Sequence, residues 1–311
     1  MADDAPATTA EEPRPSGGGL GILLNRINRG MAKLRLDRAL RLGRGLGWIY
    51  GTIIRYHRAE ARSAIHRGFP HLTAEERAQV LNRMYANLGM NLVEILRLDG
   101  GQDDDLDARI RVEGEPIVRD ARSRGKGVLI LTAHLGNWDL LGMYTARRGY
   151  PLTIISKEIR QPAVNAMWMR MRRDYGVAIV PSRNSYRDCL RVLKRNELLG
   201  FILDQNRPRE TGIFVDFFGR PACTSPGLAY LSAQAQAPVV PVFIHREDGG
   251  RHVLRALPAI EPPPDRSEES IRKATQHYTR IIEDAVREHP DQWIWIHRRW
   301  KTQPRPPSPP P

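Results

Sequence analysis

Residues 128–139 read Val-Leu-Ile-Leu-Thr-Ala-His-Leu-Gly-Asn-Trp-Asp, and the class of fold follows from this segment. The six residues 128–133 are apolar or favour β-structure, and they follow Gly125 and Gly127, so they predict a buried strand of an α/β sheet. Residues 139–146 predict a helix that follows directly. His134 therefore lies at the carboxyl end of a central strand, where open α/β sheets carry their ligand sites.

His134 and Asp139 form the candidate catalytic pair, in an HX4D motif. The turn between them allows the carboxylate of Asp139 to fold back toward the imidazole. A carboxylate that accepts one ring N–H fixes the tautomer, and the other ring nitrogen becomes a general base. A substrate that brings its own hydroxyl then needs no serine or cysteine nucleophile. A histidine at a strand end is also often a hydrogen-bonded part of the structure only, so this segment alone supports both interpretations.

The rest of the chain alternates between β-rich and helical stretches. The 311 residues are 41% hydrophobic, enough to bury the core of one large domain with a helical appendage. Strands are predicted at 128–133, 152–155, 177–180, 199–203, 213–217 and 239–244, and helices at 138–148, 163–174, 185–196, 225–236 and 268–288. This alternation predicts an α/β fold with a central mixed, mostly parallel sheet flanked by helices.

The pattern divides the chain into four regions. Residues 1–19 are expected to be disordered, and 303–311 form a proline-rich disordered tail. Residues 20–108 form a helical N-terminal region, in which Thr73 opens a capping box and begins a helix. Residues 109–302 form the α/β domain.

The positive charge is concentrated in the N-terminal region. The net charge is +13, and between Arg26 and Arg67 eleven Lys and Arg face two acids. Basic residues interleaved with Trp, Tyr and aliphatic side chains favour a membrane interface. Only ten uncharged residues lie between Arg44 and Arg55, against the roughly twenty that a spanning helix needs, so the region is expected to lie on a bilayer. The alternatives are a basic helix packed on the α/β domain, or a patch that attracts nucleic acid or an acidic protein.

Composition also excludes several classes of protein. Cys189 and Cys223 are the two cysteines, with no CxxC motif and no His/Cys cluster, so neither a zinc site nor a disulfide framework is expected. No metal is predicted. Residues 1–19 lack the apolar core of a secretory signal. A Gly-x-Ser-x-Gly elbow is absent from the sequence, which argues against a hydrolase. The four glycines between residues 43 and 51 follow no strand, so they indicate close helix packing or a kink rather than a dinucleotide loop.

Further polar residues follow predicted strands. Lys157 and Asp204 each fall at a strand end, as His134 does, and parallel strands bring such ends to one rim. Arg172 and Arg173 lie on the helix that follows Lys157. Asp204 can equally cap the next turn or pair with Arg172.

A basic and aromatic segment, 293–302, ends the α/β domain. It contains Arg298 and Arg299 among four aromatic or histidine side chains. Such a mixture suits a phosphate-bearing amphiphile, although an arginine at a solvated end is the ordinary alternative.

Taken together, these segments resemble the late (lauroyl- or myristoyl-type) acyltransferases of lipid A biosynthesis, which belong to the lysophospholipid acyltransferase superfamily. The similarity covers roughly residues 40–303. The segments that carry it, in the family's order, are 134–139, Asp204 with Gln205, 217–219 with Thr224, 239–241 and 295–302.

The resemblance implies a membrane-associated O-acyltransferase, of class EC 2.3.1. His134, oriented by Asp139, would deprotonate a hydroxyl of a lipid A precursor or related glycolipid, and the oxygen would attack an acyl thioester. Donors near this motif, either Asn137 or backbone N–H groups at the start of the helix, would stabilise the oxyanion. By family analogy an Arg–Asp pair supports the site, with Arg172 and Asp204 the best matches and Arg173 an equal candidate. Lys157, Arg298 and Arg299 would bind substrate.

The resemblance also implies partners and a location. The acyl donor would be an acidic acyl carrier protein or coenzyme A, with no other cofactor, and no nucleic acid is expected. The protein would lie on the cytoplasmic face of the cell inner membrane, peripheral or monotopic. Three departures concern the acceptor: Asp139 where many members have Glu, Lys157 where Arg is common, and no clear transmembrane segment.

These departures leave two other hypotheses about function open. One is the same chemistry on a phosphatidylinositol mannoside, a lysophospholipid or an aminoacyl lipid. Outside the class, the alternative is a non-catalytic basic protein that binds lipid or nucleic acid.

Overall fold

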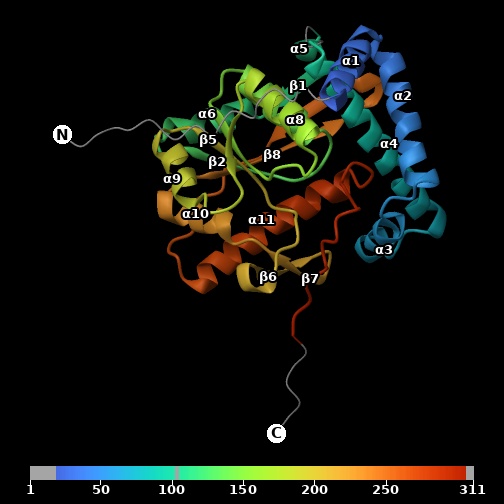
Figure 1. The fold of residues 1–311 in the computed structure, drawn as a ribbon. Coiled ribbons are helices and arrows are strands. Elements are labelled where there is room, and N and C mark those ends of the chain that lie inside the picture. Colours follow the sequence, from blue (N-terminus) through green and yellow to red (C-terminus); the bar gives the residue numbers. More distant parts are fainter. Residues whose placement is uncertain (1–18, 102–104, 306–311) are drawn as a thin grey trace.

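The computed structural model of the chain describes residues 19–101 and 105–305 (Figure 1). Within these residues the main sheet has seven strands, in the order β1 (Ile110–Glu113), β9 (His252–Ala256), β8 (Val239–Arg246), β2 (Val128–Thr132), β5 (Leu198–Ile202), β3 (Leu152–Ser156) and β4 (Ala178–Pro181). Neighbouring strands are parallel except β8 and β9. This confirms the predicted α/β fold with a mixed, mostly parallel sheet.

Helices cover both faces of the sheet. Side chains alternate along a strand, so on β2 Leu129 and Leu131 join one apolar cluster, and Val128 and Ile130 join another. Residues of α3 (Arg58–Gly68), α9 (Tyr186–Lys194), α10 (Gly227–Ala235) and α11 (Glu268–Glu288) complete the first cluster. Residues of α6 (Glu115–Ser123), α7 (Trp138–Arg147) and α8 (Pro162–Asp174) complete the second.

A long helix, α4 (Ala74–Asp99), connects the N-terminal region to both layers. It begins at the predicted capping box, in which the Glu76 N–H donates to the Thr73 hydroxyl at 3.2 Å and the Thr73 N–H donates to the Glu76 carboxylate at 2.7 Å. Met84 of this helix belongs to the first cluster, and Ile95 belongs to the second. The helical region therefore shares its core with the sheet.

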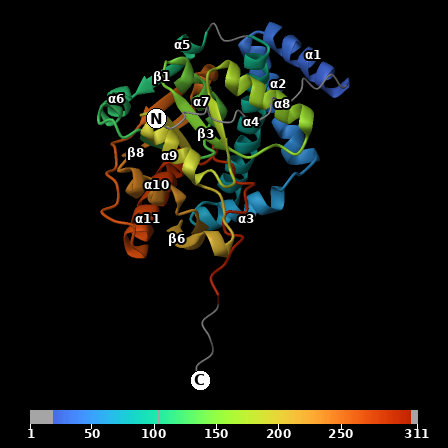
Figure 2. The ribbon, with the colours of Figure 1, turned by 60° about the vertical axis from the view of Figure 1, so that its left-hand side comes forward.

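The first helices, α1 (Gly19–Lys33) and α2 (Leu36–Trp48), lie with the short π-helix η1 (Ile49–Ile53) on one side of the molecule, next to α4 (Figures 1 and 2). The α2 glycines confirm the predicted close packing, because a Cβ on Gly47 would lie 2.1 Å from the carbonyl oxygen of Tyr85. A Cβ on Gly89 of α4 would lie 2.0 Å from the carbonyl oxygen of Gly43. None of the helices in the described part of the chain has the length and hydropathy to cross a bilayer.

Other segments depart from the prediction. The predicted strand β6 (Ile213–Phe217) lies outside the main sheet and pairs antiparallel with β7 (Arg220–Thr224). Strands β1, β7 and β9 were not predicted, since each is short and carries charged or polar residues. The remaining short elements are α5 (Leu106–Arg109), η2 (Arg209–Thr211) and η3 (Asp248–Gly250).

The predicted ends of the chain fall mainly outside the described residues. Of the region expected to be disordered, residues 1–18 are not described, and Gly19 already belongs to α1. Of the predicted tail, residues 306–311 are not described. Gln303 is attached to the body of the protein, because its side chain donates to the Trp300 carbonyl and its carbonyl accepts from Arg209, each at 2.5 Å.

Candidate active site

His134 lies directly beyond β2, at the carboxyl end of this central strand, as predicted. The turn that follows requires glycine, because Gly136 has a φ of +58° and a Cβ there would lie 2.0 Å from the Ile244 carbonyl oxygen. The C-terminal segment pairs with this turn: the Gly136 N–H donates to the Gln292 carbonyl at 3.0 Å, and the Ile294 N–H donates to the His134 carbonyl at 3.2 Å. The far end of the chain therefore holds the histidine in place.

Asp204 is the carboxylate that contacts the imidazole of His134. Its Oδ1 lies 2.9 Å from Nδ1 of the ring, and its Oδ2 accepts the His134 backbone N–H at 2.8 Å. The indole N–H of Trp293 also donates to Oδ2, at 2.7 Å. This corrects the prediction that Asp139 orients His134. Asp204 follows β5, the parallel neighbour of β2, so the two residues leave the sheet at the same rim.

Asp204 is an ionised group in the interior. Burial alone would raise the pKa of Asp204, but the charge of His134 and the hydrogen bonds from it hold that pKa below its usual value. An acceptor on Nδ1 favours the tautomer with the proton on Nδ1, which leaves Nε2 to accept a proton. Nε2 lies 3.4 Å from the side-chain nitrogen of Gln205, the residue next to Asp204.

Asp139 pairs with Arg172 instead. Its Oδ1 accepts from Nη2 of Arg172 at 2.7 Å and from Nε at 3.1 Å. Nη1 of the same arginine donates to the Ser156 hydroxyl at 2.9 Å. The site thus contains the predicted Arg–Asp pair, but its carboxylate is Asp139 rather than Asp204. Arg172 is therefore the arginine of the pair. Arg173 is exposed, because successive residues of a helix point in different directions.

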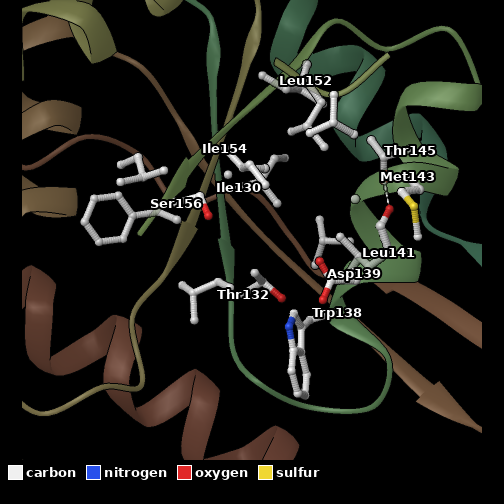
Figure 3. Close-up of a pocket in the computed structure, with 18 of the residues that line it drawn as sticks. Ile130, Thr132, Trp138, Asp139, Leu141, Met143, Thr145, Leu152, Ile154 and Ser156 are labelled. Atoms are coloured by element: carbon white, nitrogen blue, oxygen red, sulfur yellow. Dashed lines mark hydrogen bonds between the residues drawn. The ribbon is translucent and has the colours of Figure 1, made fainter. Parts of the chain in front are cut away.

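A cavity of about 390 Å³ opens beside His134 and Asp139. Figure 3 shows Ile130, Ile154 and Leu141 along it, between Leu152 at one end and Trp138 with Asp139 at the other. Its volume lies in the range of small-molecule pockets. The polar site therefore stands at one end of a long, mainly apolar space.

Two rings pack against the imidazole of His134. The Trp138 ring is edge-on, with a centroid separation of 5.0 Å, and the His297 ring lies at the same separation. Burial lowers the pKa of His297, and the nearby His134 lowers it further. The sequence analysis did not assign His297 or Trp293 to the site, although both lie in the basic and aromatic segment 293–302 and His297 lies in the part that carries the resemblance.

Asn137, predicted to stabilise an oxyanion, is buried and serves the structure. Its Oδ1 accepts the Leu140 N–H at 3.2 Å and caps α7, and its Nδ2 donates to Glu94 at 2.9 Å. The same carboxylate pairs with Arg246 at 2.6 Å. The amide of Asn137 is thus turned toward α4 and away from the cavity, which corrects its predicted role.

The two C-terminal arginines also differ from the prediction of substrate binding. Arg299 is 1% exposed and donates to the Cys223 carbonyl at 3.0 Å and the Thr224 hydroxyl at 2.5 Å. It also donates to the Gln205 carbonyl at 3.4 Å, so its side chain connects β7 to the segment that follows β5. Arg298 points to the surface and pairs with Glu60 at 3.0 Å. Neither residue lines the cavity.

Lys157 directly follows β3, at the strand end that the sequence predicted, and it lines the cavity. It is exposed, and it lines the opening together with Arg172 and Arg207. These three cations make the mouth suited to an anionic or acidic substrate. In the portion of the chain that is described, no group of three or more His, Cys, Asp or Glu side chains is arranged to hold a metal ion.

Comparison of the sequence with known families identifies the class of protein. The sequence pattern of the family described as "Bacterial lipid A biosynthesis acyltransferase" matches residues 20–302. The chain belongs to this family and is an acyltransferase.

Curated relatives are similar over most of their length. A lipid A biosynthesis acyltransferase of Haemophilus influenzae is 26% identical over 257 residues, which is 82% of this chain and 79% of the relative. The lipid A biosynthesis palmitoleoyltransferase of Escherichia coli is 26% identical over 265 residues, 85% of each chain. A phosphatidylinositol mannoside acyltransferase of Mycobacterium tuberculosis is 24% identical over 183 residues, covering 58% of this chain and 56% of the relative.

Proposed function

We propose that this protein transfers a fatty acyl group from an acyl thioester to a hydroxyl of a lipid A precursor or a related glycolipid. The observation that carries the proposal is that His134, held through Nδ1 by the buried Asp204, stands at the polar end of an apolar cavity. The names of the lipid A relatives support this class of acceptor.

In the proposed reaction, Nε2 of His134 accepts the proton of the acceptor hydroxyl. The oxygen attacks the thioester carbonyl, a C–O bond forms, the C–S bond breaks, and the thiolate takes the proton back from the imidazolium. Asp204 stabilises the imidazolium while it carries the proton. Asp139 contacts Arg172 and positions its guanidinium, which with Lys157 binds anionic groups of the substrates.

The proposed donor is an acyl carrier protein. The mouth of the cavity carries Lys157, Arg172 and Arg207, and the whole chain has a net charge of +13. Such a surface attracts an acidic carrier and accelerates its association. Rates with matched acyl carrier protein and acyl coenzyme A test this choice, and faster transfer from the coenzyme A thioester at equal concentration would replace the carrier protein as donor.

The proposed location is the cytoplasmic face of the inner membrane, where α1, α2 and η1 contact the lipid. Trp48, Ile53 and Ile54 are 55%, 62% and 61% exposed. The same elements expose Leu20, Ile22, Leu23, Ile27, Leu42, Leu46 and Ile49 together with Arg26, Arg29, Lys33, Arg38, Arg41 and Arg44. Apolar and basic side chains on one surface favour an interface with anionic lipid.

Vesicle binding tests this surface. The protein is expected to float with vesicles that contain phosphatidylglycerol and less with pure phosphatidylcholine. The Trp48→Ser/Ile53→Ser double variant should float less than a control with Tyr186→Ser, an exposed aromatic on α9. Equal flotation of all three proteins would contradict the proposed surface.

A second acceptor class is supported by one comparison. The relative that acts on phosphatidylinositol mannoside is aligned with 58% of this chain, so a mannolipid is the alternative acceptor. The proposed chemistry is the same in both cases.

The decisive experiment measures transfer with purified protein, an acyl thioester and each acceptor, followed by mass spectrometry of the lipids. The wild type should add one acyl group to the lipid A precursor, and His134→Ala should not. His277→Ala is the matched control, because this histidine is exposed on α11. Acylation of the mannolipid only would replace the acceptor, and equal activity of His134→Ala and wild type would overturn the mechanism.

A further inference from the structure

We infer that Glu115, Arg148 and Tyr150 close the far end of the cavity and thereby limit the length of the acyl chain that the enzyme transfers. The inference rests on the proposed acyl transfer and adds the residues that select the acyl group. All three side chains line the same cavity as His134 and Asp139.

The depth of the cavity follows from its strands. The cavity runs along β3, where it is lined by Leu152, Ile154, Ile155 and Ser156. Ser156 stands at the polar end beside Arg172, and Leu152 lies at the opposite end (Figure 3). Four residue steps separate them, roughly 13 Å of strand. The cavity therefore runs about the length of β3, so an extended acyl chain has a path along this strand.

A second wall is formed by α7 and the residue that follows it. The residues of this wall beyond the catalytic end are Leu141, Gly142, Met143, Tyr144, Thr145 and Arg148. Residues near the start of this helix stand at the site, and Arg148 follows its last turn. The helix and β3 thus run the same length of the cavity, from the catalytic end to Arg148 and Tyr150.

A polar cluster ends this apolar space. The Glu115 carboxylate accepts from Nη2 of Arg148 at 3.0 Å and from the Tyr150 hydroxyl at 3.1 Å. The side chains of Glu115 and Arg148 are 28% and 43% exposed, so solvent lies beyond the cluster. Each methylene buried before the cluster favours binding, whereas a longer chain must displace hydrogen-bonded, charged groups and enter water.

Gly142, in the wall formed by α7, is a position where a larger side chain should shorten the cavity. Gly142 lies opposite Leu152, and a Cβ on Gly142 would meet only the Leu152 Cδ2, at 3.9 Å. A larger side chain therefore has room to start but extends into the path of the acyl chain. Replacing a helical glycine by leucine also favours the helix, so the variant is expected to fold.

The test uses the full-length protein, the lipid A precursor and an equimolar, graded series of saturated acyl carrier protein thioesters. Tyr150→Ala opens the end of the cavity and should raise the ratio of longer to wild-type-preferred products about tenfold or more. Gly142→Leu should change the ratio about as much toward shorter chains. Both variants should keep total transfer within a few-fold of wild type with their preferred donor.

Two controls separate this inference from its alternatives. Tyr150→Phe keeps the ring that closes the end, and Glu261→Ala breaks an exposed ion pair with Arg124 outside the cavity, so neither should change the product lengths. Unchanged product lengths in both Tyr150→Ala and Gly142→Leu, with transfer retained, would overturn the inference and leave the proposed function intact. No transfer by wild type from any thioester would overturn the proposed function, and this inference with it.

Discussion

Asp139 and Asp204 are two buried carboxylates of one site, and their surroundings give them different tasks. Asp204 accepts two hydrogen bonds from His134 and one from Trp293. Asp139 accepts two from the guanidinium of Arg172. The carboxylate five positions after the histidine in sequence is thus not the one that touches its ring. Residues that follow neighbouring parallel strands meet at the edge of the sheet, as His134 and Asp204 do. A residue close in sequence but on the next helix, as Asp139 is, points in another direction.

The largest expected effect comes from removing the charge beside the imidazole. Asp204→Asn keeps the shape of the side chain but cannot stabilise the imidazolium, so kcat should fall by about 100-fold or more with little change in KM. Steady-state kinetics across a pH series measures this effect, and Asp204→Glu should recover part of kcat. An Asn variant with wild-type kcat and pH profile would contradict the role of Asp204.

A smaller effect is expected from the other carboxylate. Asp139→Asn leaves Arg172 without its ionic partner in a mostly buried place, at a cost of about tenfold in kcat/KM, the worth of one charge-assisted hydrogen bond. The change should appear mainly in KM, because Asp139 positions a substrate-binding cation rather than the base. If Asp139→Asn lowers kcat more than Asp204→Asn does, the assignment of the two carboxylates is reversed.

Arg172→Lys tests whether the geometry of the guanidinium group matters for the pair with Asp139. Lysine keeps the charge, but a single ammonium group cannot reproduce the planar guanidinium contacts with both Asp139 and Ser156. KM should therefore rise about threefold, with kcat preserved. The same substitution at the exposed Arg173 should leave both constants unchanged. Equal effects at the two positions would show that the fork geometry at residue 172 does not matter.

The smallest effect concerns stability in acid. The pKa of Asp204 lies below its unfolded value of about 3.9, so this group stabilises the fold above that pH, and the contribution is lost as the pH falls. Thermal unfolding should show wild type more stable than Asp204→Asn at about pH 5, and this difference in stability should narrow below about pH 4. If the stability difference between wild type and Asp204→Asn instead widens in acid, the expected direction of the pH dependence is wrong.

Local patterns predicted much of this site. The strand before His134, the capping box at Thr73 and the ends of β3 and β5 follow from apolar runs and short polar signals, and these placed Lys157 and Asp204 on one rim with His134. Asn137 and Arg299 were misassigned because a polar residue in a motif looks the same whether it binds substrate or a buried neighbour. Their partners, Glu94 and Thr224, lie far from them in sequence.

The amino-acid sequence is enough to predict the class of fold, the place of His134 at a strand end, the basic and apolar N-terminal helices and the family resemblance. These depend on periodicity and local motifs, which are properties of neighbouring residues. Three contacts depend on the folded arrangement of the whole domain: Asp204 with His134, Arg172 with Asp139, and Tyr150 with Glu115 at the end of the cavity. The order of strands in the sheet differs from their order in the chain, so β5 lies beside β2 although β3 and β4 come between them in sequence. Contacts of that kind arise only when the whole sheet has formed.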